Sequence, residues 1–271
     1  MSMLKIGDIV TRKSHGQDIY FIVTDIQNKD SSKPVYILRG LFYRIIVDAF
    51  EDDLVKKDSR STRINLRRDL TMARSNAYRQ IFTSRCFLFS KPRQRPGKVL
   101  HIDSSESFLK MRRNLYKEAG ITSREYLAPE SEQPNIIKRA LAETKPDILV
   151  VTGHDSLKKG SDPNLLDSYR NSKYFIECVK EARKYQPDYD KLCIFAGACQ
   201  SYFEAIMQAG ANFASSPGRI NINALDPAIV SEKVALTNKD NYVTPEEVSK
   251  LTISGSKGIG GIKTRGHLTV L

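Results

Sequence analysis

The sequence predicts an α/β protein, a three-layer sandwich around a mostly parallel sheet, preceded by a small β module. From Lys98 onward, β-rich apolar runs alternate with segments of helical spacing, and this alternation is typical of parallel sheets covered by helices on both faces. The first 56 residues contain only short β-rich runs separated by Gly, Asn and Pro. The 271 residues suffice for one or two domains with a sizeable core.

Residues 1–56 form the predicted module. Its β-rich runs are Gly7–Arg12, Ile19–Ile26, Val35–Arg39 and Tyr43–Asp48. Four or five strands in a segment of this length indicate an SH3-like barrel with a structural or docking role. Nucleic-acid binding is the alternative, but the module lacks stacking aromatics interleaved with basic residues.

Residues 57–97 are strongly basic, and only their middle, Asn65–Phe82, has a modest helical spacing. Pro92 and Pro96 close the segment. One interpretation is a solvated linker rich in Arg. The others are an RNA-binding arm and a protease-sensitive strap.

Residues 98–271 form the predicted α/β domain. In chain order we expect a strand at Lys98–Asp103, a helix at Glu106–Ala119 capped by Gly120, a short strand at Ile121–Leu127, a helix at Pro134–Glu143, a strand at Pro146–Val151, a helix at Tyr169–Tyr185, a strand at Lys191–Ala196, a helix at Ser201–Gln208, a strand at Ala211–Pro217, helices at Asp226–Leu236 and Pro245–Leu251, and an edge hairpin at Gly258–Leu271.

Two of these strands end in residues suited to catalysis. One leads into Gly153-His154-Asp155 and the other into Ala198-Cys199-Gln200. A strand–helix–strand crossover makes the two strands parallel, so their carboxyl ends share one edge of the sheet. If the strands are neighbours, we expect His154 and Cys199 to approach each other there, at the edge where open parallel sheets place their sites. The N-terminus of the helix after Cys199 would favour a thiolate.

The composition limits the classes of function. A net charge of +12 implies attraction to acidic partners. The four cysteines include no CxxC pair and the histidines also number four, which argues against a zinc site and a disulfide framework. No cofactor is expected. No window has the length of a membrane span and the start lacks a signal peptide, which indicates synthesis in a cytoplasm.

Several long motifs carry a family resemblance. They are Val-Thr-Gly-His154-Asp, Phe-Ala-Gly-Ala-Cys199-Gln-Ser, Ala-Asn-Phe-Ala-Ser-Ser-Pro217, Ala-Leu-Asp226-Pro and Gly-Gly-Ile-Lys-Thr-Arg-Gly266, with Ile6-Gly-Asp-Ile-Val-Thr-Arg-Lys-Ser at the start. Together they resemble the YabG family of sporulation-specific proteases everywhere except the basic middle. The resemblance implies a peptidase of endospore-forming bacteria. It implies trimming of spore-coat and spore-associated proteins, in the mother-cell cytoplasm and the coat, with cleavage next to Arg.

At a looser level the chain is similar to caspase-like peptidases, which carry the catalytic His and Cys at the ends of adjacent strands roughly 50 residues apart. Here the separation is 45 positions, from 154 to 199, and Asp155 stands where caspases have Gly. The mechanism expected is nucleophilic attack by Cys199, with His154 as general acid and base. The backbone N–H groups of Cys199 and Asp155 would hold the oxyanion.

An arginine-selective pocket needs a carboxylate to pair with the guanidinium. Asp103 ends a strand at the same sheet edge, in the position that helps to form this pocket in caspase-like enzymes, and Asp226 is the second candidate. The alternative role for each is a helix cap or turn carboxylate. An enzyme that cuts beside Arg would also have its own Arg60–Arg95 segment as a substrate, so self-cleavage is a further hypothesis.

Two other functions remain open at this point. A nucleic-acid-binding or scaffold protein of the spore would use the barrel and the basic segment, with the α/β domain inert. Binding that weakens with salt would support it. A serine hydrolase is disfavoured because the chain has no Gly-x-Ser-x-Gly elbow.

Overall fold

A parallel sheet is the centre of the larger domain. The computed structural model describes residues 4–28, 33–62, 64, 71 and 94–270. Within them the sheet has the order β13-β11-β10-β9-β7-β8, and all neighbours are parallel except the antiparallel pair β11 and β13. The strands are β7 (Val99–Asp103), β8 (Ser123–Leu127), β9 (Ile148–Val151), β10 (Cys193–Ala196), β11 (Phe213–Ser215) and β13 (Ile259–Gly261). A mixed α/β fold with a largely parallel sheet is therefore confirmed.

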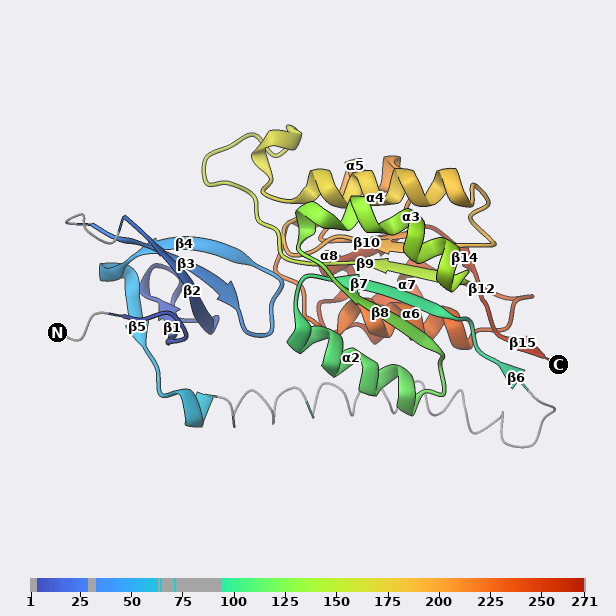
Figure 1. The fold of residues 1–271 in the computed structure, drawn as a ribbon, viewed down its shortest axis with the longest axis horizontal. Helices are drawn as coiled ribbons and strands as arrows, with labels where there is room; N and C mark the ends of the chain where they lie inside the picture. The colour runs from blue at the N-terminus through green and yellow to red at the C-terminus, as the bar shows by residue number, and fades with distance from the viewer. Residues whose placement is uncertain (1–3, 29–32, 63, 65–70, 72–93, 271) are drawn as a thin grey trace.

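Helices cover both faces of this sheet (Figure 1). Alternate strand residues point to opposite faces, and two separate apolar clusters result, one with Leu149 and Ile194 and the other with Ile148 and Phe195. The first cluster packs under α3 (Gln133–Thr144), α4 (Ser172–Tyr185) and α5 (Phe203–Gln208), and the second under α2 (Glu106–Glu118), α6 (Asp226–Leu236) and α7 (Pro245–Leu251).

The strands that end in the predicted catalytic residues are direct neighbours. In the parallel register Ile148 lies opposite Cys193 and Val151 lies opposite Ala196. The expected crossover is thus confirmed, with α4 as its helix. The direction of winding reverses between β7 and β9, because the chain runs from β7 outward to β8 and then returns to β9. Such a reversal opens a crevice at the carboxyl ends of the strands.

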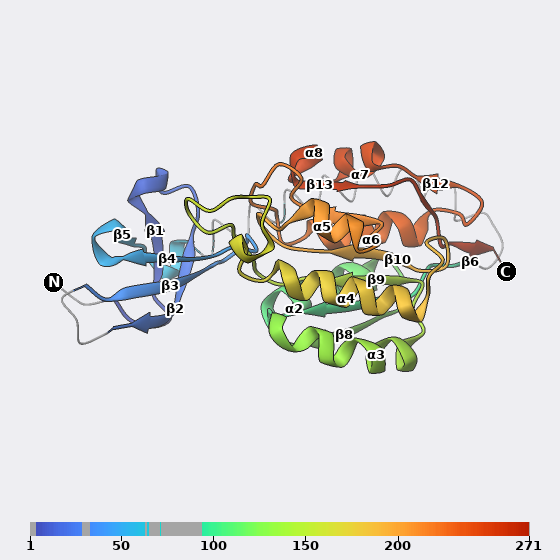
Figure 2. The ribbon, with the colours of Figure 1, turned by 90° about the horizontal axis from the view of Figure 1, so that it is seen from above.

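The first residues form a separate antiparallel sheet with the order β4-β3-β2-β1-β5. Its strands are β1 (Ile9–Arg12), β2 (Phe21–Gln27), β3 (Val35–Gly40), β4 (Ile46–Phe50) and β5 (Leu54–Lys56). This N-terminal module lies beside the α/β domain along the long axis of the molecule, as Figures 1 and 2 both show. Its apolar cluster also includes Cys199 and Ile222 of the domain, so the two parts share a buried contact.

Two local expectations were wrong. The helix after Cys199 begins at Phe203 and not at Ser201, because Gln200 has a positive φ of 53° that interrupts the chain's path into the helix. The C-terminal segment is not a hairpin. Its strands β13, β14 (Thr264–Arg265) and β15 (Thr269–Val270) pair instead with β11, β12 (Tyr242–Val243) and β6 (Gln94–Arg95).

Most of the basic segment, including the predicted helix at Asn65–Phe82, lies outside the described residues. Among the residues that are described, no helix is long and apolar enough to cross a membrane. The remaining described helix is α8 (Gly255–Gly258), a single turn before β13.

Candidate active site

The loops that follow β9 and β10 converge on one oxygen atom. The backbone N–H of Asp155 donates to the carbonyl oxygen of Arg44 at 3.1 Å, and that of Cys199 donates to the same oxygen at 3.3 Å. These are the two N–H groups that the sequence suggests for an oxyanion site. Arg44 belongs to the β3–β4 loop of the N-terminal module, which reaches the end of the sheet.

The side chain of Arg44 enters the crevice between β7 and β9 and is fully buried. Its Nη1 donates to Oδ2 of Asp103 at 2.5 Å and to the carbonyl of Gly153 at 3.5 Å. Its Nη2 donates to the carbonyl of Ala224 at 3.4 Å. Asp103 therefore lies in a closed pocket that holds a guanidinium group.

Asp103 is shared between two arginines. Arg112 of α2 donates to the same Oδ2 at 2.9 Å, and Thr152 donates to it at 2.5 Å. Burial alone would raise the pKa of Asp103, but the positive charges of Arg112 and Arg44 outweigh burial and hold that pKa well below its usual range. The carboxylate is ionised at neutral pH.

His154 is oriented by an acidic partner. Its Nδ1 lies 3.5 Å from Oε1 of Glu130 and 3.2 Å from Oγ of Ser104, and its own backbone N–H donates to Glu130 at 2.6 Å. Burial would raise the pKa of Glu130, but the hydrogen bonds and charge of His154 lower it below its usual value. Ser104 donates its hydroxyl hydrogen to Glu130 at 2.5 Å, so its oxygen can only accept from Nδ1 of His154. Nδ1 therefore carries the hydrogen, and Nε2 is left to act as a base.

The position of Glu130 also accounts for the glycine at position 153. A Cβ on Gly153 would lie 2.4 Å from Oε1 of Glu130, so only glycine lets the acidic side chain approach the loop before His154. The imidazole ring is stacked on Phe108 with the ring centroids 5.8 Å apart. Together these contacts fix the ring in one orientation.

The Cys199 thiol is fully buried. Its Sγ accepts the backbone N–H of Ile222 at 3.2 Å, and among the described residues no hydrogen bond joins it to His154. Burial raises the pKa of Cys199 to about 12. The expected helix N-terminus at Gln200–Ser201 is absent, so it does not lower this pKa. The Cys199 sulfur lies in the loop after β10 and the His154 imidazole in the loop after β9, and the two loops meet at the Arg44 carbonyl.

Asp155 ties the loops after β9 and β10 together. Its carboxylate accepts the backbone N–H groups of Ser156 and Asn171 at 2.9 and 2.8 Å. It also accepts the hydroxyl of Ser172, at the start of α4, at 2.5 Å and that of Ser201, just after Cys199, at 2.9 Å. Burial raises its pKa to about 6. The side chain thus holds the β9 loop to the β10 loop.

Asp226 has a different environment from Asp103. Its carboxylate accepts the backbone N–H groups of Ile253 and Ser254 at 2.7 and 3.1 Å, and burial raises its pKa to about 6. Among the described residues no hydrogen bond or ion pair joins Asp226 to Arg44, which donates instead to the carbonyl of Ala224, two residues earlier. Asp226 anchors the chain between α7 and α8, which is the turn role that the sequence also allowed.

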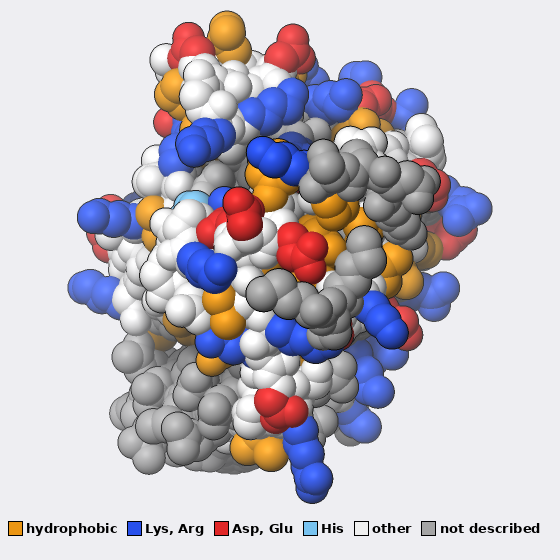
Figure 3. Space-filling model, turned by 90° about the vertical axis from the view of Figure 1, so that its left-hand side faces the viewer, with side chains coloured by type: hydrophobic (Ala, Val, Ile, Leu, Met, Phe, Trp, Pro, Cys, Tyr) orange, Lys and Arg blue, Asp and Glu red, His pale blue; other side chains and the backbone are white. Residues whose placement is uncertain are grey.

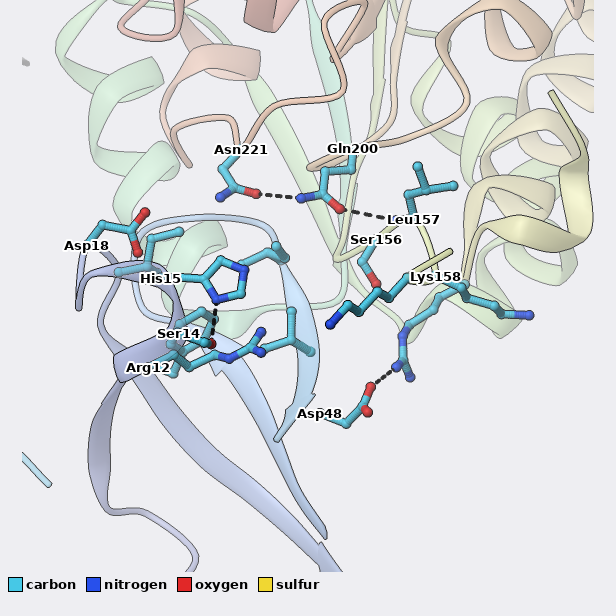
Figure 4. Close-up of a pocket in the computed structure, with 16 residues that line it drawn as sticks. Arg12, Ser14, His15, Asp18, Asp48, Ser156, Leu157, Lys158, Gln200 and Asn221 are labelled. Atoms are coloured by element: carbon cyan, nitrogen blue, oxygen red, sulfur yellow. Dashed lines mark hydrogen bonds and ion pairs between the residues drawn. The ribbon is translucent and has the colours of Figure 1, made fainter. Parts of the chain in front are cut away.

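A cavity of about 520 Å³ lies beside Ile45, between the module and the loops after β9 and β10. Arg12, His15 and Asp48 line it on one side and Lys158 and Gln200 on the other (Figure 4). Among the described residues no group of three His, Cys, Asp or Glu could hold a metal ion.

Three contributors to this site were missed at the sequence level. Arg44 lies in a β-rich run, and its only signal is a charged residue between apolar neighbours. Glu130 lies in a polar stretch between two expected elements, where nothing distinguishes it from a surface residue. Arg112 lies within α2 beside apolar residues and could have been suspected as a buried cation.

Comparison with known proteins gives a consistent result. The sequence model of the YabG peptidase U57 family matches residues 5–271. The chain is 40% identical over 283 residues to the sporulation-specific protease YabG of Bacillus subtilis (strain 168), covering 98% of this chain and 97% of that protein. No solved structure matches.

The raised pKa of Asp155 predicts a pH-dependent stability. Its pKa in the folded protein, about 6, exceeds the ordinary value of 3.8. The protonated side chain therefore stabilises the fold fully below pH 3.8, and this stabilisation is lost as the pH rises through the folded-state pKa. The loss is about 3 kcal/mol. We expect the free energy of unfolding, measured by urea titration, to fall with rising pH between about pH 4 and 7 in the wild type. In Asp155→Asn this slope against pH should be flatter. Asp240→Asn, on the exposed surface, should leave the slope unchanged. Equal slopes for wild type and Asp155→Asn would contradict the assignment.

Proposed function

The chain belongs to the YabG family of sporulation-specific proteases, and from that premise we propose that it is a cysteine endopeptidase that cleaves after arginine. The observation that supports this most is the placement of Arg44. Its carbonyl oxygen accepts hydrogen bonds from Cys199 and Asp155 while its guanidinium pairs with Asp103. One arginine residue thereby contacts both proposed oxyanion donors and the proposed specificity carboxylate.

The proposed reaction begins with Cys199. Its Sγ adds to the carbonyl carbon of the substrate arginine, and the oxyanion is held by the N–H groups of Cys199 and Asp155. His154 takes the thiol proton and gives it to the leaving amine as the C–N bond breaks. Water, activated by His154, then hydrolyses the thioester and regenerates the thiol. Glu130 holds the imidazole in the tautomer that this requires.

Selectivity for arginine follows from the shape of the pocket. A guanidinium spans Asp103 and two backbone carbonyls, of Gly153 and Ala224, with separate N–H groups. A lysine ammonium is a compact point charge and cannot donate along the same fork. Asp103 is therefore the proposed specificity carboxylate, and Asp226 is proposed to support the segment that carries Ala224.

We also propose a fold or role for each of the three parts of the chain. We regard residues 98–271 as a caspase-like peptidase domain, residues 57–97 as a basic linker and residues 1–56 as an SH3-like docking module. The His and Cys positions at adjacent strand ends support the first assignment. The five-stranded antiparallel order of the module supports the last.

The natural substrates proposed are spore-coat and spore-associated proteins, met in the mother-cell cytoplasm and in the coat. The name of the relative supports a role in sporulation. The alternative, a nucleic-acid-binding or scaffold protein, would use the barrel together with the basic segment, most of which lies outside the described residues. On the face shown in Figure 3, Lys and Arg side chains are dispersed among acidic ones and form no continuous stripe.

The proposed nucleophile can be tested directly. We expect Cys199→Ala and His154→Ala each to lower the rate of cleavage of an arginyl peptide by at least about 10³-fold, because each removes a group that forms or breaks a bond. Cys178→Ala, which changes a buried cysteine of α4, should retain activity. Wild-type turnover by Cys199→Ala would exclude the mechanism.

The proposed pocket predicts a loss of selectivity. In Asp103→Asn the charged partner of the guanidinium is gone, so kcat/KM for an arginyl substrate should fall on the order of 10²-fold or more. The ratio of arginyl to citrullyl cleavage should collapse with it. Asp240→Asn, on the exposed surface, serves as the control and should keep the ratio. An unchanged arginine preference in Asp103→Asn would remove Asp103 from the pocket.

Self-cleavage in the basic segment is also proposed, at arginines between Arg60 and Arg95. Incubated wild-type protein should yield fragments whose intact masses map to that segment, whereas Cys199→Ala should stay whole. Identical masses for the two proteins would count against self-cleavage.

A further inference from the structure

We propose that the β3–β4 loop, residues 41–45, is a built-in inhibitor that competes with substrate for the cleft by occupying it with Arg44, so that the wild-type enzyme cleaves other peptides only when the loop leaves. The inference rests on the proposed function, since it takes the crevice at Asp103 as the substrate pocket. The ligand that the cleft accepts is an arginyl peptide segment, and in the resting protein that segment belongs to the chain itself.

The loop binds through its backbone as well as through its side chain. The N–H of Ala224 donates to the carbonyl of Phe42 at 3.0 Å, and Tyr43 forms an antiparallel bridge with Asn223. An extended peptide that adds to a strand-like edge in this way is a recurrent mode of peptide recognition. The rim at Asn223–Ala224 is thereby assigned as the part of the cleft that takes the residues before the arginine.

Occupation of the cleft by the loop excludes a second peptide. Arg44 and Cys199 both have 0% exposure, so neither the pocket nor the sulfur is open to a substrate. The same burial keeps the thiol protonated, with its pKa raised to about 12. A catalytic thiol in this state is a poor nucleophile.

The loop is built to remain in place. Arg39 and Ile46 are paired across β3 and β4, and the N–H of Gly40 donates to the carbonyl of Ile45 at 2.9 Å. A Cβ on Gly40 would lie 2.5 Å from the carbonyl oxygen of Tyr43, so glycine is needed for so tight a loop. Both sides of the Arg44–Ile45 bond are thus fixed by the same sheet.

This anchoring explains why the loop would inhibit and not simply be consumed. Attack by Cys199 would form a thioester at Arg44 and release the amine of Ile45. The β3–β4 pairing would hold that amine next to the acyl carbon, where it can attack the thioester, restore the peptide bond and free the thiol. A tethered amine competes with water through its high effective concentration.

Outside the β3–β4 loop, a cavity lies between the module and the domain. The cavity beside Ile45 separates them (Figure 4), and Asp48 forms an ion pair with Arg170 at its edge. Arg44 is fully buried in this interface and donates to Asp103, Gly153 and Ala224 of the domain. Removing its side chain should free the cleft for other arginyl peptides.

Binding to the inactive protein tests this without catalysis. We would measure the Kd of a fluorescent, amidated peptide ending in arginine for Cys199→Ala and for Cys199→Ala with Arg44→Gln. The tethered loop competes at an effective concentration of millimolar order, so we expect the second variant to bind at least tenfold more tightly. Arg39→Gln, in the same module on β3, is the matched control and should not change the Kd.

The outcomes separate the inference from the proposed function. Equal Kd values with and without Arg44→Gln, both folded by circular dichroism, would overturn the inhibitor and leave the proposed chemistry standing. Arg44→Lys, which keeps a cation, should give an intermediate Kd and covers the case in which Arg44→Gln does not fold. If tighter binding is found but no cysteine-intact variant cleaves the peptide, occupancy of the cleft stands and the proposed catalysis fails.

Discussion

The structure depends on one contact, in which Arg44 of the N-terminal module meets the carboxyl ends of three parallel strands. The loop after β9 and the loop after β10 both donate to its carbonyl oxygen, and Asp103 at the end of β7 receives its guanidinium. Backbone N–H groups buried without a partner are costly. The loops after β9 and β10 therefore need an acceptor at that point, whether it comes from the module or from a substrate.

The charges of the pocket follow from the same contact. Asp103 is a buried carboxylate with a permanent partner in Arg112, and a second arginine can join it because carboxylate oxygens accept several hydrogen bonds. Thr152 and Ser105 satisfy the remaining positions. A buried pair stabilises little by itself, since desolvation offsets the attraction. What it provides here is a fixed geometry around the guanidinium groups of Arg44 and Arg112.

The side chains of His154 and Cys199, the proposed catalytic pair, are held in position to different extents. His154 is held by Glu130, Ser104 and the ring of Phe108, so the orientation of its imidazole is set before any substrate arrives. Cys199 is held by Ile222 in an apolar contact with the module, where its thiol is neutral. Orientation of the base therefore comes from the α/β domain alone, whereas the environment of the thiol depends on whether the module is docked.

The sequence by itself determined most strands and helices of the α/β domain, the parallel direction of β9 and β10, and the placement of His154, Cys199 and Asp103 at the carboxyl ends of strands. These follow from local periodicity and from the handedness of crossovers, which depend on residues close in the chain. That β9 and β10 are direct neighbours was decided by the tertiary structure. Only the tertiary structure decided that Arg44 fills the pocket, that Glu130 orients His154 and that the Cys199 thiol is buried. Each of these joins segments far apart in the chain, as Arg44 with Asp103 does across 59 positions. No periodicity or spacing in one sequence records which distant side chains will share a crevice, because that depends on how two separately folded sheets dock.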